Sequence, residues 1–175
     1  TTADPAIRRY AEEMRIFGKN LDTGEIDKIG NDWFMDEIRA CVGYHHLQDA
    51  IDQRPQRDAV VARYRECLAN QPGLSLLDVP ENQSPCFYQF AVLLDARLDT
   101  PALRSALKDN HGVQAKIIYQ PTHLETVFRA YDDGTLKQTE HTLNRSLCLP
   151  LHGAITPDDA EVIAAALVGE IRAQQ

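Results

Sequence analysis

From residue 86 onward the sequence alternates short apolar runs with helix-start signals, and this alternation constrains the fold most. The apolar runs are CFYQFAVLL (86–94), VQAKIIY (113–119) and SLCLP (146–150). Thr100-Pro101 and Thr156-Pro157 open segments in which apolar residues recur at helical spacing, as in capped amphipathic helices. Strands that alternate with helices predict a layered α/β domain, in which helices pack on a small sheet.

Caps and glycines mark the helices of this part of the chain. The helix from Thr100 has its predicted end at Gly112, because glycine readily adopts the left-handed conformation that closes helices. A short helix is predicted at about 138–145. The last helix follows Thr156-Pro157-Asp158-Asp159, which is close to a capping box. Its apolar face comprises Ala160, Ile163, Ala164, Leu167 and Ile171.

The first 70 residues read as helices and one long loop. Asp4-Pro5 predicts a capped helix that Gly18 stops. Residues 19–32 contain two glycines and many polar side chains, which predicts a loop, and long loops often serve function. The run 34–70 is helical in pattern, and Pro55 inside it predicts two helices or one sharp kink. These helices need a packing partner outside themselves.

Composition limits the partners. The 175 residues are 43% hydrophobic and 25% charged, which suits one sizeable core or one domain with an appendage. The formal net charge of −8 argues against nucleic acid or an anionic membrane as the main partner. No stretch reaches membrane-span length and no signal peptide is visible. The cytoplasm is therefore the expected location.

Cysteines and histidines offer no metal-ligand spacing. The four cysteines, at positions 41, 67, 86 and 148, are widely separated, and we expect reduced, mostly buried thiols. The adjacent His45 and His46 diverge by about 100° on a helix, so they cannot share one metal ion. The sequence predicts no metal site.

The junction GNDWFMDEIRACVG (30–43) is the first candidate site. Asn31 or Asp32 would cap a helix whose first turns carry Asp36 and Glu37, and acidic residues suit a helix N-terminus. The alternative is that this helix start, which follows a glycine-bearing loop, offers side-chain donors to a phosphate. The residues alone favour the cap.

The stretch YQPTH (119–123) is the second candidate site. Tyr119 and His123 follow a predicted strand, and ligands are usually held at the strand ends of open α/β sheets. Both side chains can hydrogen-bond a polar substrate. The alternative is a turn whose tyrosine and histidine satisfy local backbone groups, and the residues leave both interpretations open.

These segments, in this order, resemble the C-terminal half of the DegT/StrS family of pyridoxal-phosphate-dependent sugar aminotransferases. The family junction reads glycine, any residue, asparagine, aromatic, arginine, methionine, any residue and glutamate, before an alanine-rich helix. Here it is matched by GNDWFMDEIRA (30–40). Tyr119, Pro121, His123 and Leu124 match a strand-end pattern of the family, and LPLHGAITPDDAEVI (149–163) matches its last helix. The resemblance covers nearly the whole chain.

The resemblance assigns roles to particular residues. Aligned on Met35, the family's asparagine, which reaches the cofactor phosphate of the neighbouring subunit, falls on Asp32, and its arginine falls on Phe34. A carboxylate repels a phosphate, so either Asn31 takes over the contact or the cofactor is held weakly. Asn31 and Asp32 are therefore the expected cofactor-binding residues, and Tyr119 and His123 the expected substrate-binding residues.

The resemblance also implies the architecture. The expected fold is the α/β C-terminal small domain of a fold-type-I aminotransferase, a small sheet with packed helices, preceded by helices of the large domain. Residues 1–33 would be the tail of the large cofactor-binding domain with an active-site loop. Residues 34–72 would be connecting helices, and 73–175 the small domain.

The implied activity is amino transfer from an amino acid to a keto sugar that is nucleotide-linked, in a homodimeric enzyme. The lysine that forms the Schiff base lies upstream in the family. None of the five lysines here (Lys19, Lys28, Lys108, Lys116 and Lys137) stands in that context, so this chain alone is expected to hold no catalytic residue and to be inactive. The alternative is a non-catalytic α/β binding or dimerisation module.

Overall fold

The computed structural model describes residues 2–175. The chain divides into two compact units, one ending at Ile51 and the other comprising Asp52–Gln175, and each is described by itself. The boundaries expected after residues 33 and 72 follow from the family resemblance and stay predictions. Within residues 2–175, no helix is long and apolar enough to cross a membrane.

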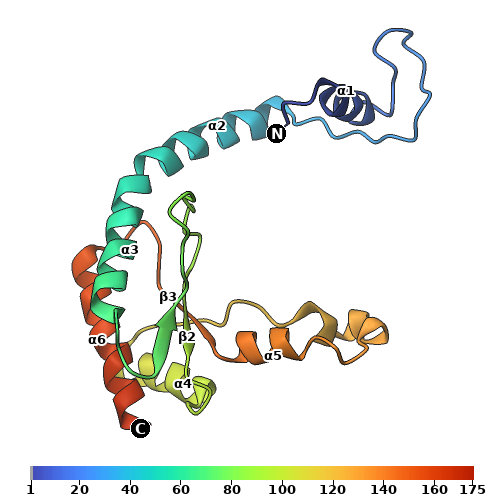
Figure 1. Cartoon of the computed structure of the whole chain (residues 1–175). Coiled ribbons are helices and arrows are strands. Elements are labelled where there is room, and N and C mark those ends of the chain that lie inside the picture. Colours follow the sequence, from blue (N-terminus) through green and yellow to red (C-terminus); the bar gives the residue numbers. More distant parts are fainter. Residues whose placement is uncertain (1) are drawn as a thin grey trace. The chain divides into compact units, whose positions relative to one another are not determined.

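The first unit begins with helix α1 (Pro5–Met14), labelled in Figure 1. Asp4 caps it as predicted, because its Oδ1 accepts hydrogen bonds from the backbone N–H groups of Ala6 and Ile7 at 2.8 and 3.2 Å. The helix ends at Met14, before Gly18, whose φ of 75° turns the chain into the predicted loop.

The loop 19–32 folds back against the end of α1. Bridges join Ile16 to Asp32 and Lys19 to Ile26. A Cβ atom on Gly30 would clash with the backbone nitrogen of Gly18, so the two glycines permit a close approach that larger residues would prevent. This contact fixes where the candidate junction starts.

Helix α2 (Glu37–Asp52) follows the junction. The predicted cap at Asn31 or Asp32 is wrong, because the helix starts later and Asp36 Oδ1 accepts a hydrogen bond from Arg39 N at 2.9 Å. None of the 16 residues of α2 is buried within the described chain. The sequence predicted that the helices of this region need a packing partner, and α2 has no buried face within the described chain.

The second unit has helices on a three-stranded antiparallel sheet. Its elements are α3 (Arg54–Leu68), β1 (Leu74–Leu76), β2 (Phe90–Leu94), α4 (Thr100–His111), the 3-10 helices η1 (Thr122–Leu124) and η2 (Thr126–Tyr131), α5 (Lys137–Asn144), β3 (Ser146–Leu149) and α6 (Pro157–Ala173). The strand order is β1-β2-β3. Leu74 pairs with Leu94, and Phe90 pairs with Leu149.

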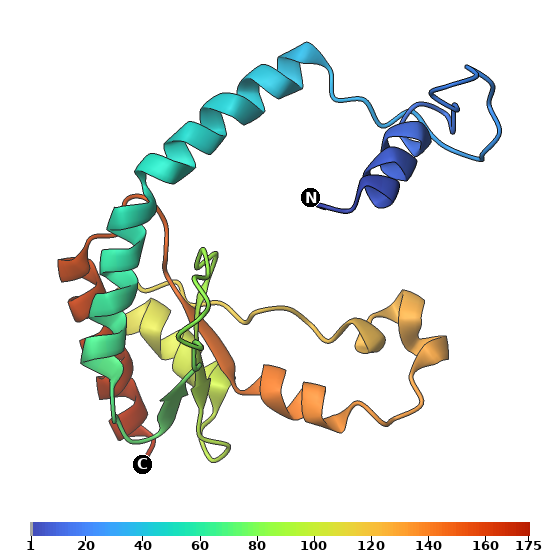
Figure 2. The ribbon, with the colours of Figure 1, turned by 45° about the horizontal axis from the view of Figure 1, so that its top comes forward.

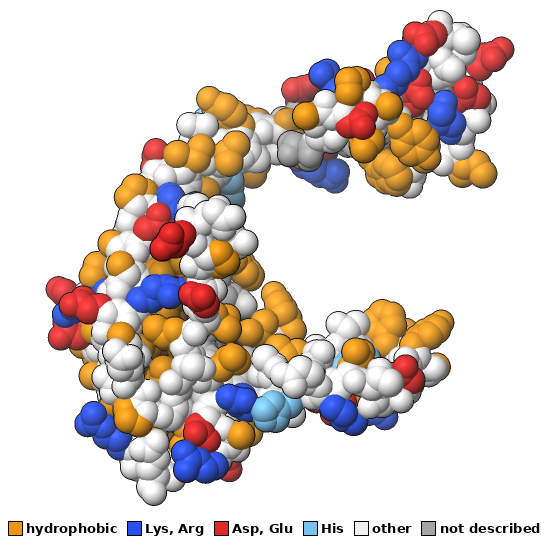
Figure 3. Space-filling model, viewed as in Figure 1, with side chains coloured by type: hydrophobic (Ala, Val, Ile, Leu, Met, Phe, Trp, Pro, Cys, Tyr) orange, Lys and Arg blue, Asp and Glu red, His pale blue; other side chains and the backbone are white. Residues whose placement is uncertain are grey.

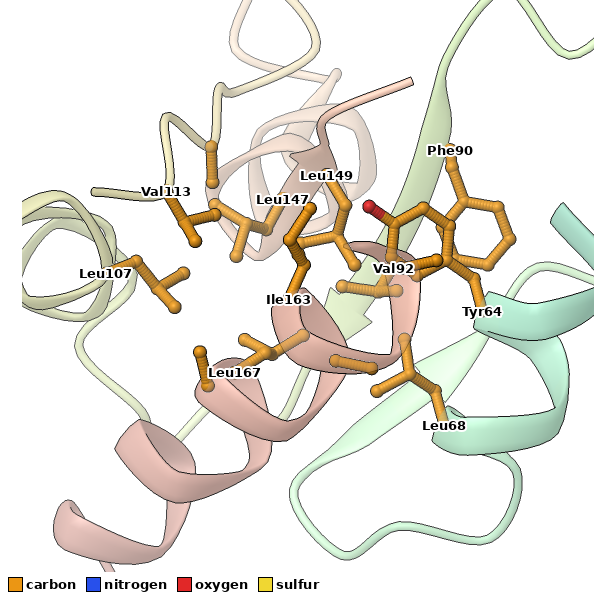
Figure 4. Close-up of a cluster of buried hydrophobic side chains, with 14 of the residues drawn as sticks. Tyr64, Leu68, Phe90, Val92, Leu107, Val113, Leu147, Leu149, Ile163 and Leu167 are labelled. Atoms are coloured by element: carbon orange, nitrogen blue, oxygen red, sulfur yellow. The ribbon is translucent and has the colours of Figure 1, made fainter. Parts of the chain in front are cut away.

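The core lies between this sheet and helices α3, α4 and α6 (Figure 4). Figures 1 and 2 show α3 and α6 side by side, and these helices pack against each other. Tyr64 stacks on Phe90 with ring centroids 4.8 Å apart, and its hydroxyl donates to Pro150 O at 2.9 Å. Each fully buried leucine or valine contributes about 2 kcal/mol, so this core stabilises the unit that carries YQPTH.

The predicted caps of the second unit are confirmed. Gly112 ends α4 with a φ of 69°. Thr156 and Asp159 form a reciprocal capping box, with Asp159 N donating to Thr156 Oγ1 at 3.2 Å and Thr156 N donating to Asp159 Oδ2 at 2.9 Å. At Pro55 the pattern resolves into two helices, since α2 ends at Asp52 and α3 begins at Arg54.

Two strand predictions are corrected. The run 86–94 is a strand only from Phe90, because Phe87 has a φ of 46°, which an extended strand cannot contain. The run 113–119 is no strand: Lys116 alone bridges Cys148, with Lys116 N donating to Cys148 O at 3.0 Å. A local hydrogen bond from Ala115 N to Val113 O at 3.1 Å precedes this bridge, and the chain bends at Ile118 beyond it. Strand β1 was not predicted.

The cysteines are less buried than expected. Cys148 is buried, Cys67 is intermediate, and Cys41 and Cys86 are exposed. The prediction of mostly buried thiols is therefore wrong. Cys41 lies on α2, none of whose residues is buried within the described chain, and Cys86 lies in the loop before β2.

Candidate functional site

The backbone around Asn31 is fixed by α1. Asn31 N donates to Met14 O at 3.0 Å, and Asn31 O accepts from Phe17 N at 3.1 Å. Its side-chain Oδ1 accepts from Asp32 N at 2.9 Å. The amide Nδ2 makes no hydrogen bond within residues 2–175 and is exposed. Asn31 therefore presents a free donor at a fixed position.

Asp32 presents the opposite chemistry. Its Oδ1 accepts from Phe34 N at 3.4 Å, and no lysine or arginine pairs with it in the described part of the chain. Asp36 and Glu37 add two more carboxylates at the start of α2. Asp36 is paired with Arg39 Nε at 3.2 Å. An anion at this junction would therefore be attracted by Asn31 and repelled mainly by Asp32 and Glu37. The donor set fits a phosphate at Asn31 and not at Asp32.

Arg15 is a functional candidate that the sequence analysis missed. Its guanidinium carbon lies 5.3 Å from the ring centroid of Phe34, the residue that stands where the resembling family has an arginine. A guanidinium over an aromatic face is attracted by the ring. The contact places a positive charge beside the junction. Arg15 has no sequence signal, because it precedes Phe34 by a whole loop and only folding brings the two together.

An ionic cluster holds the loop that leads to this junction. The Glu13 carboxylate, with a side chain only 6% exposed, pairs with Lys28 Nζ at 3.0 Å and Arg9 Nε at 3.1 Å. The hydrogen bond from Lys28 lowers the pKa of Glu13, and the backbone N–H of Leu21 adds to this. The cluster holds both ends of the loop against α1, so these contacts fix the position of Asn31.

The second candidate site, YQPTH, lies in the second unit and is described separately from the junction. Tyr119 is 63% exposed and lines a cavity of about 210 Å³ between α4, the segment 117–121 and the end of α5. The other polar side chains of this cavity belong to Thr100, Arg104, Gln120 and Asn144. Oxygen and amide groups of this kind suit a hydroxyl-rich ligand.

His123 does not share this cavity. Its side chain is 9% exposed, and its Nε2 lies 3.4 Å from Oε1 of Glu140 on α5. Glu140 also pairs with Lys137 Nζ at 3.0 Å, and this pairing, followed by the interaction with His123, lowers the pKa of the Glu140 carboxyl. The structure thus places Tyr119 in a cavity and His123 in the contact between η1 and α5. These elements project from the sheet (Figure 2).

A larger cavity of about 840 Å³ lies elsewhere in the second unit, along the segment after β3 and the start of α6. It contains neither Tyr119 nor His123. Several of its polar groups have internal partners: His111 contacts Glu170 at 2.8 Å, and Asp159 belongs to the capping box. Size alone therefore does not make it the candidate site.

Comparison with known proteins identifies related sequences and structures. A sequence model of the DegT/DnrJ/EryC1/StrS aminotransferase family matches residues 1–168. An uncharacterized protein of Methanocaldococcus jannaschii is 27% identical, over 91% of this chain and 45% of its own length. The dTDP-4-amino-4,6-dideoxy-D-glucose transaminase of Shigella dysenteriae is 24% identical, over 92% of this chain and 44% of its own length.

Among solved structures, S. venezuelae DesV in complex with a ketimine intermediate superposes with a TM-score of 0.82 at 24% identity. The superposition covers 98% of this chain and 46% of that protein. The likeness confirms the predicted fold class, a small sheet with packed helices that corresponds to part of an aminotransferase. The chain spans about half the length of the relatives it matches.

Proposed function

The chain belongs to the DegT/DnrJ/EryC1/StrS aminotransferase family, and on this basis we propose that the whole protein transfers an amino group from an amino acid to a nucleotide-linked keto sugar. Curated relatives named as transaminases of dTDP-linked and UDP-linked amino sugars support the nucleotide linkage. The observation in this chain that carries the proposal is the polar cavity beside Tyr119.

The family depends on pyridoxal phosphate, which when bound supplies the electron sink for amino transfer. In this chain, the free Nδ2 of Asn31 is the group that would donate a hydrogen bond to the cofactor phosphate. Arg15, held over Phe34, would supply the positive charge that the family takes from an arginine at the Phe34 position. The carboxylate of Asp32 would weaken this phosphate site.

The substrate side is assigned to Tyr119 and His123. The exposed phenol of Tyr119 would hydrogen-bond a sugar hydroxyl in its cavity, with Gln120 and Asn144 as further partners. His123, which Glu140 holds at the edge of α5, would orient the turn and present its second ring nitrogen. Both residues bind and position substrate in this proposal, and neither makes or breaks a bond.

The five lysines of the chain are not the Schiff-base residue in this proposal. Lys28 is engaged by Glu13 and Asp27, and Lys137 is engaged by Glu140. The test is borohydride reduction of the 175-residue chain with pyridoxal phosphate, followed by mass spectrometry of its peptides. Stoichiometric labelling of one lysine would overturn the assignment, whereas scattered, substoichiometric labelling agrees with it.

Amination itself is tested in the whole protein, with pyridoxal phosphate, an amino-acid donor and a set of nucleotide-linked keto sugars. The proposal expects one of these sugars to be converted to its amino derivative, and it expects the same sugar without its nucleotide to react poorly. If none of the sugars is aminated while a non-sugar keto acid is, the substrate class is wrong.

The second candidate function is a dimerisation surface, which a different observation favours. Hydrophobic side chains gather on the surface of the first unit (Figure 3). Its large exposed apolar side chains include Tyr10, Trp33, Ile38, Val42 and Leu47. Monomeric proteins rarely expose apolar surface on this scale, so we propose that this unit is covered in a homodimer.

A further inference from the structure

We propose that a cationic groove formed by α4 and residues 114–116 binds the diphosphate of the nucleotide-linked sugar. This inference rests on the proposed function for the identity of the ligand, while the groove itself is a feature of the described structure. Its cavity measures about 340 Å³ and is lined by Arg104, Ser105, Lys108, Gln114, Ala115 and Lys116.

The three cationic side chains of the groove come from two segments of the chain. Arg104 and Lys108 are one helical turn apart on the exposed face of α4, because Leu103 and Leu107 occupy the buried face. Lys116 faces them from the segment that its own backbone pins to Cys148, with N–H···O distances of 3.0 and 2.6 Å in the two directions. Both walls therefore have a fixed backbone.

No acidic residue lines this groove, although the chain has 26 acidic against 18 basic residues. Most cationic side chains elsewhere are engaged by carboxylates, carbonyls or an aromatic ring. Across residues 2–175, the lysines and arginines without such a partner are Lys19, Arg104, Lys108, Lys116, Arg129 and Arg172. Half of these unpaired cations line this one groove.

Three neighbouring cations without a counter-ion repel one another, and an oxyanion between them removes that repulsion. Arginine binds phosphate oxygens in two parallel hydrogen bonds, and lysine binds them as a point charge. The hydroxyl of Ser105 adds a neutral donor. The donors match an anion of more than one phosphate group better than a carboxylate, because a carboxylate offers only two oxygens.

Arg104 also lines the cavity that contains Tyr119, so the two cavities adjoin at this side chain. One cavity is cationic, and apart from the shared arginine the other has only uncharged polar groups and apolar walls. A nucleotide-linked sugar has the same order of chemistry, with charged phosphates next to a hydroxylated ring. The geometry orients the diphosphate along α4 and the sugar toward Tyr119.

Binding is tested by titrating the 175-residue chain with UDP, with inorganic pyrophosphate and with uridine, at low and high salt. We expect UDP and pyrophosphate to compete for one site, uridine to bind far more weakly, and salt to weaken both anions. Lys108→Gln and Lys116→Gln should each reduce the affinity for pyrophosphate about tenfold, because each removes one charge-assisted hydrogen bond.

Arg172→Gln is the matched control, because Arg172 is equally exposed and unpaired but lies on α6 outside the groove. It should leave the affinity unchanged. The groove assignment is wrong if neither anion binds, or if Arg172→Gln weakens binding as much as Lys108→Gln. Circular dichroism of each variant checks that α4 is intact.

A kinetic arm in the whole protein separates this inference from the proposed function. Lys108→Gln should raise KM for the nucleotide-linked sugar and leave KM for the amino donor unchanged. If Tyr119→Phe raises KM for the sugar but Lys108→Gln does not, the groove assignment fails and the proposed function stands. If the whole protein aminates no sugar while the chain still binds pyrophosphate through Lys108 and Lys116, the proposed function fails and the anion site stands.

Discussion

The imidazole of His123 is anchored to α5, since its Nε2 lies 3.4 Å from Oε1 of Glu140 and its side chain is only 9% exposed. Tyr119, four residues earlier, is 63% exposed and meets a different cavity. The YQPTH turn therefore combines one residue with a packing role and one residue that is free to contact a ligand. The structural role suggested by the sequence therefore falls on His123, which in the proposed function also presents its second ring nitrogen to the substrate.

The division of roles predicts different outcomes for Tyr119→Phe and His123→Ala. Tyr119→Phe should leave the melting temperature unchanged, because the hydroxyl of Tyr119 makes no hydrogen bond within residues 2–175, and should lower kcat/KM in the whole enzyme. His123→Ala should reduce the free energy of unfolding by about 1 kcal/mol, through the lost hydrogen bond and packing, and also raise KM. Thermal melts beside steady-state kinetics measure both effects. Intact kinetics in both variants would make YQPTH a turn with no substrate contact.

The Glu140 pair predicts a pH-dependent contribution to stability. Lys137 and then His123 lower the pKa of Glu140, so the carboxylate stabilises the fold above its unfolded pKa, and this contribution is lost as pH falls through the folded value. Asp133 is another charged group that faces His123. Its pKa is also lowered, mainly by its hydrogen bonds with Thr135.

Glu140→Gln should therefore be less stable than the unaltered chain at pH 6, and the difference should shrink toward about pH 3. Urea unfolding across this range measures it. Glu81→Gln is the control, since Glu81 is exposed and its side chain makes no hydrogen bond or ion pair within residues 2–175. A difference that stays constant with pH would show that Glu140 acts through packing and not through its charge.

Three helix caps could be predicted from the sequence because their signals are local, whereas the cap predicted at Asn31 or Asp32 is wrong, because α2 starts only at Glu37. Each cap acts on backbone groups only a few residues away, as at Asp4, Gly112 and the Thr156–Asp159 box. The local sequence is therefore enough to predict where these helices begin or end. The segment 113–119 was wrongly predicted to be a strand. Its apolar residues suit a strand, but only Lys116 is paired, with Cys148, and the chain bends at Ile118.

The candidate sites show the same limit. The sequence could propose Asn31 and Tyr119 as candidates, because both lie in segments that resemble family motifs. It could not identify Arg15 over Phe34, or the groove of Arg104, Lys108 and Lys116, because these contacts join segments that are separate in sequence. It also could not separate His123 from Tyr119, since their different surroundings depend on where α5 lies.

The junction predicts opposite effects for two neighbouring substitutions in the whole protein. Asn31→Ala should weaken retention of pyridoxal phosphate, because it removes the free amide donor. Asp32→Asn should leave retention unchanged or improve it, because it removes a carboxylate that repels phosphate. Cofactor absorbance after dialysis measures retention, and the reverse ranking would show that the phosphate lies nearer Asp32.

Helix α2 predicts self-association, because it is apolar on more than one side. Ile38 and Val42 lie one turn apart, 79% and 53% exposed, while Leu47 and Ile51, both 57% exposed, lie on nearly the opposite side. Such a helix needs a packing partner on two of its sides.

Sedimentation velocity of the chain should therefore show concentration-dependent association, and Ile38→Glu should shift it toward monomer. Val162→Glu is the control, since Val162 is 68% exposed on α6, outside the first unit, and this substitution should leave the association unchanged. A chain that stays monomeric at every concentration would mean that α2 is stable in water without cover, which would remove the basis for the homodimer.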